Sequence, residues 1–455
     1  MSDNFVLITG DTHLGNNTTN FLPYFDPEFR PAYEEFLETA ALATKIQAER
    51  AAKAANEAQP KQGGDAMAMM AAAPGRMLDM LLDRKQDGSV PYSREFITGN
   101  QKLRREIIQS LGYDKFDEDE FMTVLGEDDP DLRLKMLEID GTVGQVLFPQ
   151  LGFLLSSVGP NLLWAGIRAY NRFASEFAKT HPDRYATTFM VDLADIDKAC
   201  AEARFAAENG MRGGAYVASG RPPRLPAFCD PYYEPFFKTL EELNLPFNMH
   251  GAFSPGGDFG GWVSGPGAAV FNQVWIHYSN MNKGGPLMHF LSGGVFDRHP
   301  KLKIVIAETG GLYWVKEVLN TLDEIYDSNN MRATIGRRTM NEYMIKKFRE
   351  SARKPSDYFR SNCYVQGHNA TIDWKSLHAV GIDNVIWSSD FPHAEASWPY
   401  SVQEIKTVMA EAGVSLEDAR KFLGLNAAKL YGFDLKKLQP IADRVGPKLS
   451  TAAAA

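Results

Sequence analysis

Short apolar runs alternate with longer amphipathic segments along most of the chain after residue 130. The apolar runs predict strands that are buried on both faces, and the segments between them have the 3.6-residue spacing of helices. The predicted strands are residues 5–9, 143–148, 185–191, 213–217, 246–250, 302–308, 362–366 and 385–389. Strands that each precede a helix predict an α/β fold of the (β/α)8 TIM-barrel type.

A long segment with a different pattern separates the first two predicted strands. Residues 32–57 are rich in Ala, Glu and Lys at helical spacing, and residues 59–74 have low complexity. We therefore predict a barrel built from residues 1–27 and 131–440, a helical insertion over residues 28–130, and a flexible tail over residues 441–455. The insertion is expected to cover the barrel or to contact a second subunit.

The composition narrows the class of protein. Of 455 residues, 44% are hydrophobic and 23% are charged, as in ordinary globular proteins. The formal net charge is -9 and there is no basic run, which argues against a nucleic-acid partner. No secretory signal pattern or membrane-length apolar stretch occurs, so we expect a cytoplasmic protein without a membrane partner. The 3 cysteines are far apart, which disfavours a disulfide framework or a thiolate metal cluster.

Polar residues that suit metal binding follow four of the predicted strands. Asp11 and His13 follow the first strand, His250 ends the fifth, Glu308 ends the sixth and Asp390 follows the last. The carboxyl ends of barrel strands meet at one mouth, so these side chains are expected to converge. Two imidazoles with one or two carboxylates suit Zn²⁺, Mn²⁺ or Fe²⁺.

Other interpretations of these residues stay open at this point. Asp11 and His13 could form a hydrogen-bonded pair, and His250 could be a core histidine. Glu308 could be a metal ligand, an acceptor for a ligand or an acid/base. His393, in the loop after the last strand, is expected to contact substrate rather than metal. Arg212 and Arg221 are the candidates to bind a substrate carboxylate.

Several short motifs together resemble the amidohydrolase-related (Amidohydro_2) family of metal-dependent hydrolases. The resemblance runs from Asp129 to about Phe433, with the first strand added. This family includes aminocarboxymuconate-semialdehyde decarboxylase and the resorcylate-type decarboxylases. The motifs are Gly10-Asp11-Thr12-His13, His181-Pro-Asp-Arg184, Asp230-Pro-Tyr-Tyr233, His250-Gly251, Ala307-Glu-Thr-Gly310, Ser389-Asp-Phe-Pro-His393 and Asn426-Ala-Ala-Lys-Leu-Tyr431.

The resemblance implies one divalent metal ion, with zinc expected first and manganese or iron as alternatives. Its ligands would be Asp11 and/or His13, His250 and Asp390, and Asp390 would also carry a proton. Two positions depart from the family pattern, since Gly15 stands where a second first-strand histidine is usual and Glu308 replaces the sixth-strand histidine.

The function implied is that of a metal-dependent enzyme, with Asp390, Glu308 and His393 as its catalytic residues. It would act on a small organic acid or carbonyl compound. We rank a hydrolase that uses metal-activated water first, and a metal-dependent non-oxidative decarboxylase of an aromatic or muconate-like acid second. A non-catalytic scaffold is the third possibility. The family also implies a homodimer.

Overall fold

A computed structural model describes residues 3–15, 20–39, 106, 109–110, 126–150, 160–217, 225–250, 287–308, 311–327, 350–392 and 396–450 of the chain. Within these residues, 8 strands form one sheet in the order β1 to β8, and every neighbouring pair is parallel. The strands are β1 (Leu7–Leu14), β2 (Thr142–Pro149), β3 (Tyr185–Val191), β4 (Gly214–Val217), β5 (Phe247–Met249), β6 (Ile304–Ile306), β7 (Cys363–Gly367) and β8 (Val385–Trp387).

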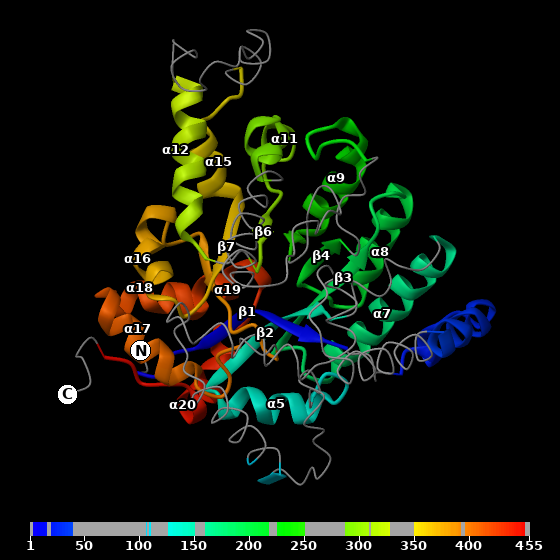
Figure 1. The fold of residues 1–455 in the computed structure, drawn as a ribbon, viewed down its shortest axis with the longest axis horizontal. Coiled ribbons are helices and arrows are strands. Elements are labelled where there is room, and N and C mark those ends of the chain that lie inside the picture. Colours follow the sequence, from blue (N-terminus) through cyan, green and yellow to red (C-terminus); the bar gives the residue numbers. More distant parts are fainter. Residues whose placement is uncertain are drawn as a thin grey trace, which may run out of the picture.

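The segment after β8 brings the sheet back to its first strand. The backbone N–H of His13 donates to the carbonyl of Phe391 at 2.8 Å, and the N–H of Asp390 donates to the carbonyl of Asp11 at 3.1 Å. Thr12 and Phe391 therefore form a parallel bridge. With helices between the strands, this arrangement is a nearly closed (β/α)8 barrel, which confirms the predicted fold (Figure 1).

Helices cover the outside of the barrel (Figure 1). They are α5 (Pro130–Ile139), α7 (Pro160–Thr180), α8 (Ile196–Glu208), α9 (Glu234–Leu243), α11 (Val295–Arg298), α12 (Tyr313–Asp327), α15 (Pro355–Asn362), α16 (Thr371–Val380), α17 (Ser401–Ala412), α18 (Leu416–Arg420), α19 (Asn426–Tyr431) and α20 (Leu435–Val445). The short helices are η1 (Leu22–Tyr24), η2 (Pro27–Phe29), η4 (Pro231–Tyr233) and the π-helical turn η5 (Lys421–Leu425).

Local sequence explains where several helices begin. The carboxylate of Asp129 accepts hydrogen bonds from the backbone N–H groups of Asp131 and Leu132, and Pro130 occupies the first position of α5. Asp195 caps α8 in the same way by accepting from the N–H of Lys198. Such caps satisfy N–H groups that have no partner inside the helix.

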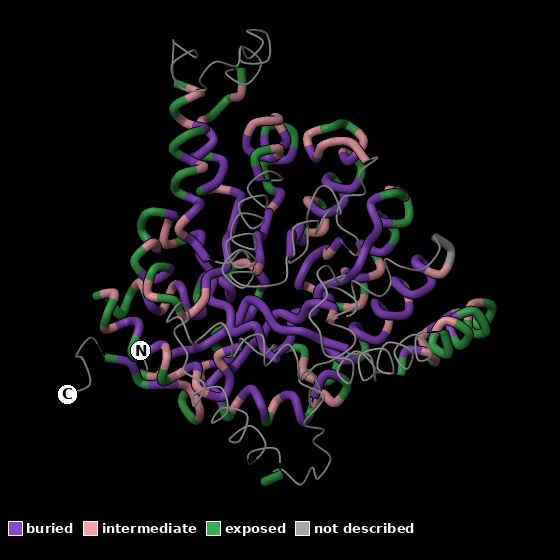
Figure 2. Tube along the Cα trace, in the orientation of Figure 1, coloured by how far each residue is buried: buried purple, intermediate pink, exposed green. Residues whose placement is uncertain are grey.

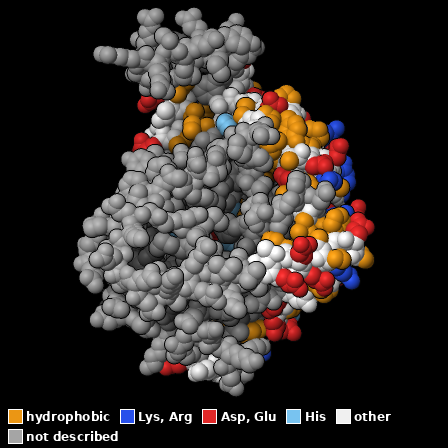
Figure 3. Space-filling view, turned by 45° about the vertical axis from the view of Figure 1, so that its right-hand side comes forward, with side chains coloured by type: hydrophobic (Ala, Val, Ile, Leu, Met, Phe, Trp, Pro, Cys, Tyr) orange, Lys and Arg blue, Asp and Glu red, His pale blue; other side chains and the backbone are white. Residues whose placement is uncertain are grey.

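The core has two layers. One lies between the strands and the helices, where Leu7, Leu147 and Phe247 pack against helical side chains. The other fills the inside of the barrel, with Ile8 and Val305 among its buried residues. The strands are accordingly buried along their whole length, except that Tyr216 in β4 is partly exposed (Figure 2). On the described part of the face shown in Figure 3, acidic, basic and hydrophobic side chains are interspersed.

Two boundaries differ from the sequence predictions. Strand β1 continues to Leu14 rather than stopping at residue 9, because its second half pairs with β2 and with the segment after β8. The tail predicted from residue 441 is wrong for its first part, because α20 runs to Val445 and Lys448 forms a bridge with Asn4. Most of the predicted insertion lies outside the described residues, although residues 30–39 are helical as expected. None of the described helices is long and apolar enough to cross a membrane.

Candidate metal centre

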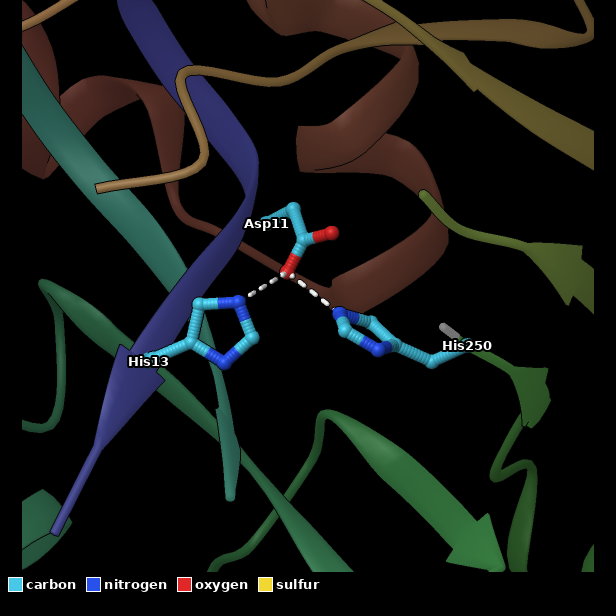
Figure 4. Close-up of side chains that lie close together, drawn as sticks. All are labelled: Asp11, His13 and His250. Carbon is cyan, nitrogen blue, oxygen red and sulfur yellow. Dashed lines mark hydrogen bonds and ion pairs between the residues drawn. The ribbon is translucent and has the colours of Figure 1, made fainter. Parts of the chain in front are cut away.

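Three side chains from two strands converge at the mouth of the barrel. Asp11 and His13 stand two residues apart on β1, and His250 directly follows β5. The Nε2 atom of His250 lies 3.0 Å from Oδ1 of Asp11, and Nε2 of His13 lies 3.9 Å from the same oxygen (Figure 4). None of the three residues exposes more than 7% of its surface. The predicted convergence of these strand ends is therefore present in the structure.

Asp390 joins this group from the segment after β8. Its Oδ1 atom lies 3.1 Å from Nε2 of His13, and the residue is 3% exposed. Its φ of 57° is in the left-handed region, which aspartate tolerates better than most residues. The backbone hydrogen bond from Asp390 to Asp11 ties β1 and the β8 segment together, so the two residues are held next to each other.

Glu308, two residues beyond β6, contacts the other side of His250. Its Oε2 atom lies 3.6 Å from Nδ1 of His250, which is an ion-pair distance rather than a short hydrogen bond. The Glu308 side chain is about one-third exposed, whereas the side chain of His250 is buried. The structure thus brings together four of the strand-end residues predicted from the sequence, and Glu308, the fifth predicted residue, lies at the edge of the group.

Burial and the neighbouring charges shift the pKa of His250 in opposite directions. Burial by itself would lower the pKa of His250, but the charge and hydrogen bond of Asp11 raise it, as do the carboxylates of Glu308 and Asp390. The net effect raises the pKa of His250 above its ordinary value. The site therefore has an excess of negative charge that favours a cation.

The donor set fits one divalent metal ion. One nitrogen from each histidine and one oxygen of Asp11 lie within 4.8 Å of one another. Among the described residues, the second oxygen of Asp11, Oδ2, is buried without a hydrogen-bond partner. Two imidazoles and a carboxylate are ligands for Zn²⁺, Mn²⁺ or Fe²⁺, and a metal ion would satisfy the buried carboxylate.

An aromatic wall beside this cluster was not found by the sequence reasoning. The rings of Phe148 on β2 and Tyr216 on β4 lie 4.4 Å and 5.8 Å from the ring of His250. Burial raises the pKa of the Tyr216 hydroxyl, and the negative charges of Glu308 and Asp11 raise it further, so the group stays protonated. The sequence pattern that could have indicated Tyr216 is the alternation within residues 213–217, because it places this side chain on the interior face of the strand.

Arg212, another candidate from the sequence, lies away from this cluster. Arg212 precedes β4, donates to the carbonyl of Pro182 at 2.7 Å and stacks on Phe433, so it is not at the mouth and the suggestion that it binds a substrate carboxylate is wrong. Its position follows from strand direction, because the residue before a parallel strand lies at the opposite end of the barrel. Arg221 and His393 lie outside the described residues.

Comparison with known proteins agrees with the fold and with the motifs. The amidohydrolase family model (Amidohydro_2) matches residues 163–433. The gamma-resorcylate decarboxylase of Rhodococcus jostii (strain RHA1) is 26% identical over 287 residues, which are 59% of this chain and 76% of that protein.

Solved structures show the same fold. An amidohydrolase from Mycobacterium avium subsp. paratuberculosis K-10 superposes with a TM-score of 0.52 and 22% identity, over 72% of this chain and 82% of that one. A 5-carboxyvanillate decarboxylase from Novosphingobium aromaticivorans, which holds manganese, gives a TM-score of 0.52 and 17% identity, over 74% of this chain and 94% of that one. The similarity to the gamma-resorcylate decarboxylase of Rhodococcus jostii favours the decarboxylase alternative over the hydrolase that we ranked first.

Proposed function

Because this chain belongs to the amidohydrolase family, we propose that it is a metal-dependent decarboxylase of a small hydroxylated aromatic acid. The observation that carries the proposal is the buried convergence of Asp11, His13 and His250 beside Asp390. The resemblance to a gamma-resorcylate decarboxylase supports the choice of reaction. The intact ligand cluster argues against the non-catalytic scaffold.

We assign the metal to Asp11, His13 and His250, with Asp390 next to it. When bound, a divalent cation supplies a Lewis acid that polarises substrate oxygens. The sequence resemblance favours zinc, whereas the Novosphingobium decarboxylase holds manganese. Both ions suit this donor set, so both are used in the test below.

Asp390 is the proposed proton carrier. In decarboxylation the bond between the ring carbon and the carboxylate breaks, CO2 leaves, and the electron pair stays on the ring carbon. That carbon then takes a proton from the carboxyl group of Asp390, which regains one from water. The carboxylate is suited to this role because it is buried and held 3.1 Å from His13.

Phe148 and Tyr216 are the side chains that we propose to contact the ring of the substrate. Their rings stand beside His250, where they would pack against the flat ring of an aromatic acid. The protonated hydroxyl of Tyr216 would donate a hydrogen bond to a substrate oxygen.

We keep His393 as a proposed substrate contact. The homodimer and the cytoplasmic location stay predictions from the sequence.

The test is a comparison of CO2 release with hydrolysis. Purified protein would be stripped of metal, reloaded with Mn²⁺ or Zn²⁺, and incubated with 2,6-dihydroxybenzoate, 5-carboxyvanillate and related hydroxybenzoates. Lactones and amides of the same acids would run in parallel. We expect metal-dependent CO2 release from at least one acid. Hydrolysis of the lactones or amides without CO2 release from any acid would reject the decarboxylase proposal in favour of the hydrolase.

A further inference from the structure

The ring of His250 lies between two carboxylates that face different nitrogens. Asp11 faces Nε2 at 3.0 Å, and Glu308 faces Nδ1 at 3.6 Å. The Nε2 side points into the proposed metal cluster (Figure 4), whereas Nδ1 faces Glu308, which follows β6. The two contacts therefore have different consequences for the imidazole.

We propose that Glu308 is a positioning residue that holds His250 through Nδ1, rather than an acid or base that acts on the substrate. This inference rests on the proposed function in so far as it takes the cluster to be a metal centre. A nitrogen that binds a metal ion carries no proton, so a neutral His250 that binds through Nε2 keeps its proton on Nδ1. Metal-binding histidines commonly direct that second N–H to a carboxylate, which fixes the tautomer and the ring orientation.

The backbone conformation at Glu308 supports a specific role for its side chain. Among the described residues, positive φ values outside glycine occur only at Asn244, Glu308 and Asp390. Asn244 ends helix α9, where this conformation is common. The other two are carboxylates beside the histidines of the mouth. A glutamate rarely adopts a φ of 48°, and this backbone places the carboxylate next to His250 rather than continuing β6.

The test measures metal binding without substrate. Glu308→Ala removes the carboxylate, whereas Glu308→Gln keeps an acceptor oxygen but removes the charge. Stripped protein would be titrated with Mn²⁺ and Zn²⁺ against a competing chelator. The visible absorption spectrum of the Co²⁺-loaded protein would report the ligand geometry. Kinetic constants at saturating metal would follow for any acid that releases CO2.

A matched control comes from a similar pair elsewhere in the chain. His299 is buried, and its Nδ1 atom lies 3.5 Å from Oε2 of Glu241. Glu241→Gln therefore alters a comparable contact between glutamate and histidine outside the cluster. We expect this variant to bind metal and to absorb light as the unaltered protein does.

For a positioning role, Glu308→Ala should weaken metal binding by about 10–100-fold and change the Co²⁺ spectrum. Glu308→Gln should weaken binding less, and its kcat at saturating metal should recover most of the unaltered value. If Glu308→Ala does not fold, weaker binding by Glu308→Gln than by the Glu241→Gln control supports the proposal.

Other outcomes would overturn the proposal. One is unchanged metal affinity in both Glu308 variants, together with a loss of kcat in Glu308→Gln of about 10²-fold or more, as expected of an acid/base. An equal loss of metal affinity in Glu241→Gln would also overturn it. If no acid in the panel releases CO2 but Glu308→Ala still weakens metal binding, the proposed reaction fails and the positioning role stands.

Discussion

Replacement of Asp390 by asparagine tests its proposed role as a proton carrier without removing its structural contacts. The φ of 57° at this position is tolerated by asparagine as well as by aspartate, so Asp390→Asn should keep the backbone in place. The amide can still form a hydrogen bond with Nε2 of His13, 3.1 Å away in the unaltered protein. The variant loses mainly the negative charge and the ability to carry a proton.

The size of the expected loss follows from general acid–base catalysis and from burial. A positioned acid or base contributes about 10²–10⁴-fold to a rate. Because Asp390 is only 3% exposed, bulk water cannot readily deliver the proton in its place. We therefore expect kcat to fall by about 10³-fold, which is ~4 kcal/mol in the activation barrier.

The assay is CO2 release at saturating metal and saturating substrate, with bound metal measured on the same samples. Asp192→Asn is the control, since Asp192 is a buried aspartate after β3 that accepts from the N–H of Ala194, and asparagine keeps that acceptor. We expect the control to stay close to the unaltered protein. Turnover by Asp390→Asn within about fivefold of the unaltered enzyme, or ~1 kcal/mol, would refute the proton-carrier role.

Three further predictions test the site and the stability of the fold. Tyr216→Phe keeps the ring beside His250 but removes the hydroxyl, so KM should rise by up to about 10-fold with an unchanged melting temperature; unchanged steady-state kinetics would exclude a hydrogen bond to substrate. Chelation of the metal should destabilise the protein, because an ion at 100 times its Kd stabilises the folded state by about 2.7 kcal/mol; denaturant unfolding with and without metal measures the difference. Burial raises the pKa of the Glu202 carboxyl, whose Oε2 accepts from Asn171. The folded state therefore binds the proton more tightly than the unfolded state does, and the stability from this group is lost as the pH rises through the folded pKa. Glu202→Gln should accordingly unfold at a higher denaturant concentration than the unaltered protein at pH 7. The gap should close as the pH falls through the raised folded pKa to the ordinary glutamate value, and a constant gap would contradict this account.

Elements built from continuous apolar runs were predicted well. Strand β3 was predicted at residues 185–191 and is observed at Tyr185–Val191, because every residue of that run is buried. Strand β1 was predicted only to residue 9, since its second half contains Asp11, Thr12 and His13. Those residues are extended because they pair with β2 and with Phe391, which are 130 or more residues away in the sequence. Local pattern carries no information on such pairing.

The chain's own pattern determined the barrel and the set of residues at its mouth, because parallel strands place all their carboxyl ends on one side. Asp11, His13, His250, Glu308 and Asp390 followed as candidates from that rule. Tertiary structure decided which atoms meet: Nε2 of His250 faces Asp11, Nδ1 faces Glu308, and Tyr216 lines the interior. These contacts depend on strand register and on the left-handed backbone at Glu308 and Asp390. Both are set by hydrogen bonds and packing between segments that are distant in the sequence, so they exist only once the barrel has formed.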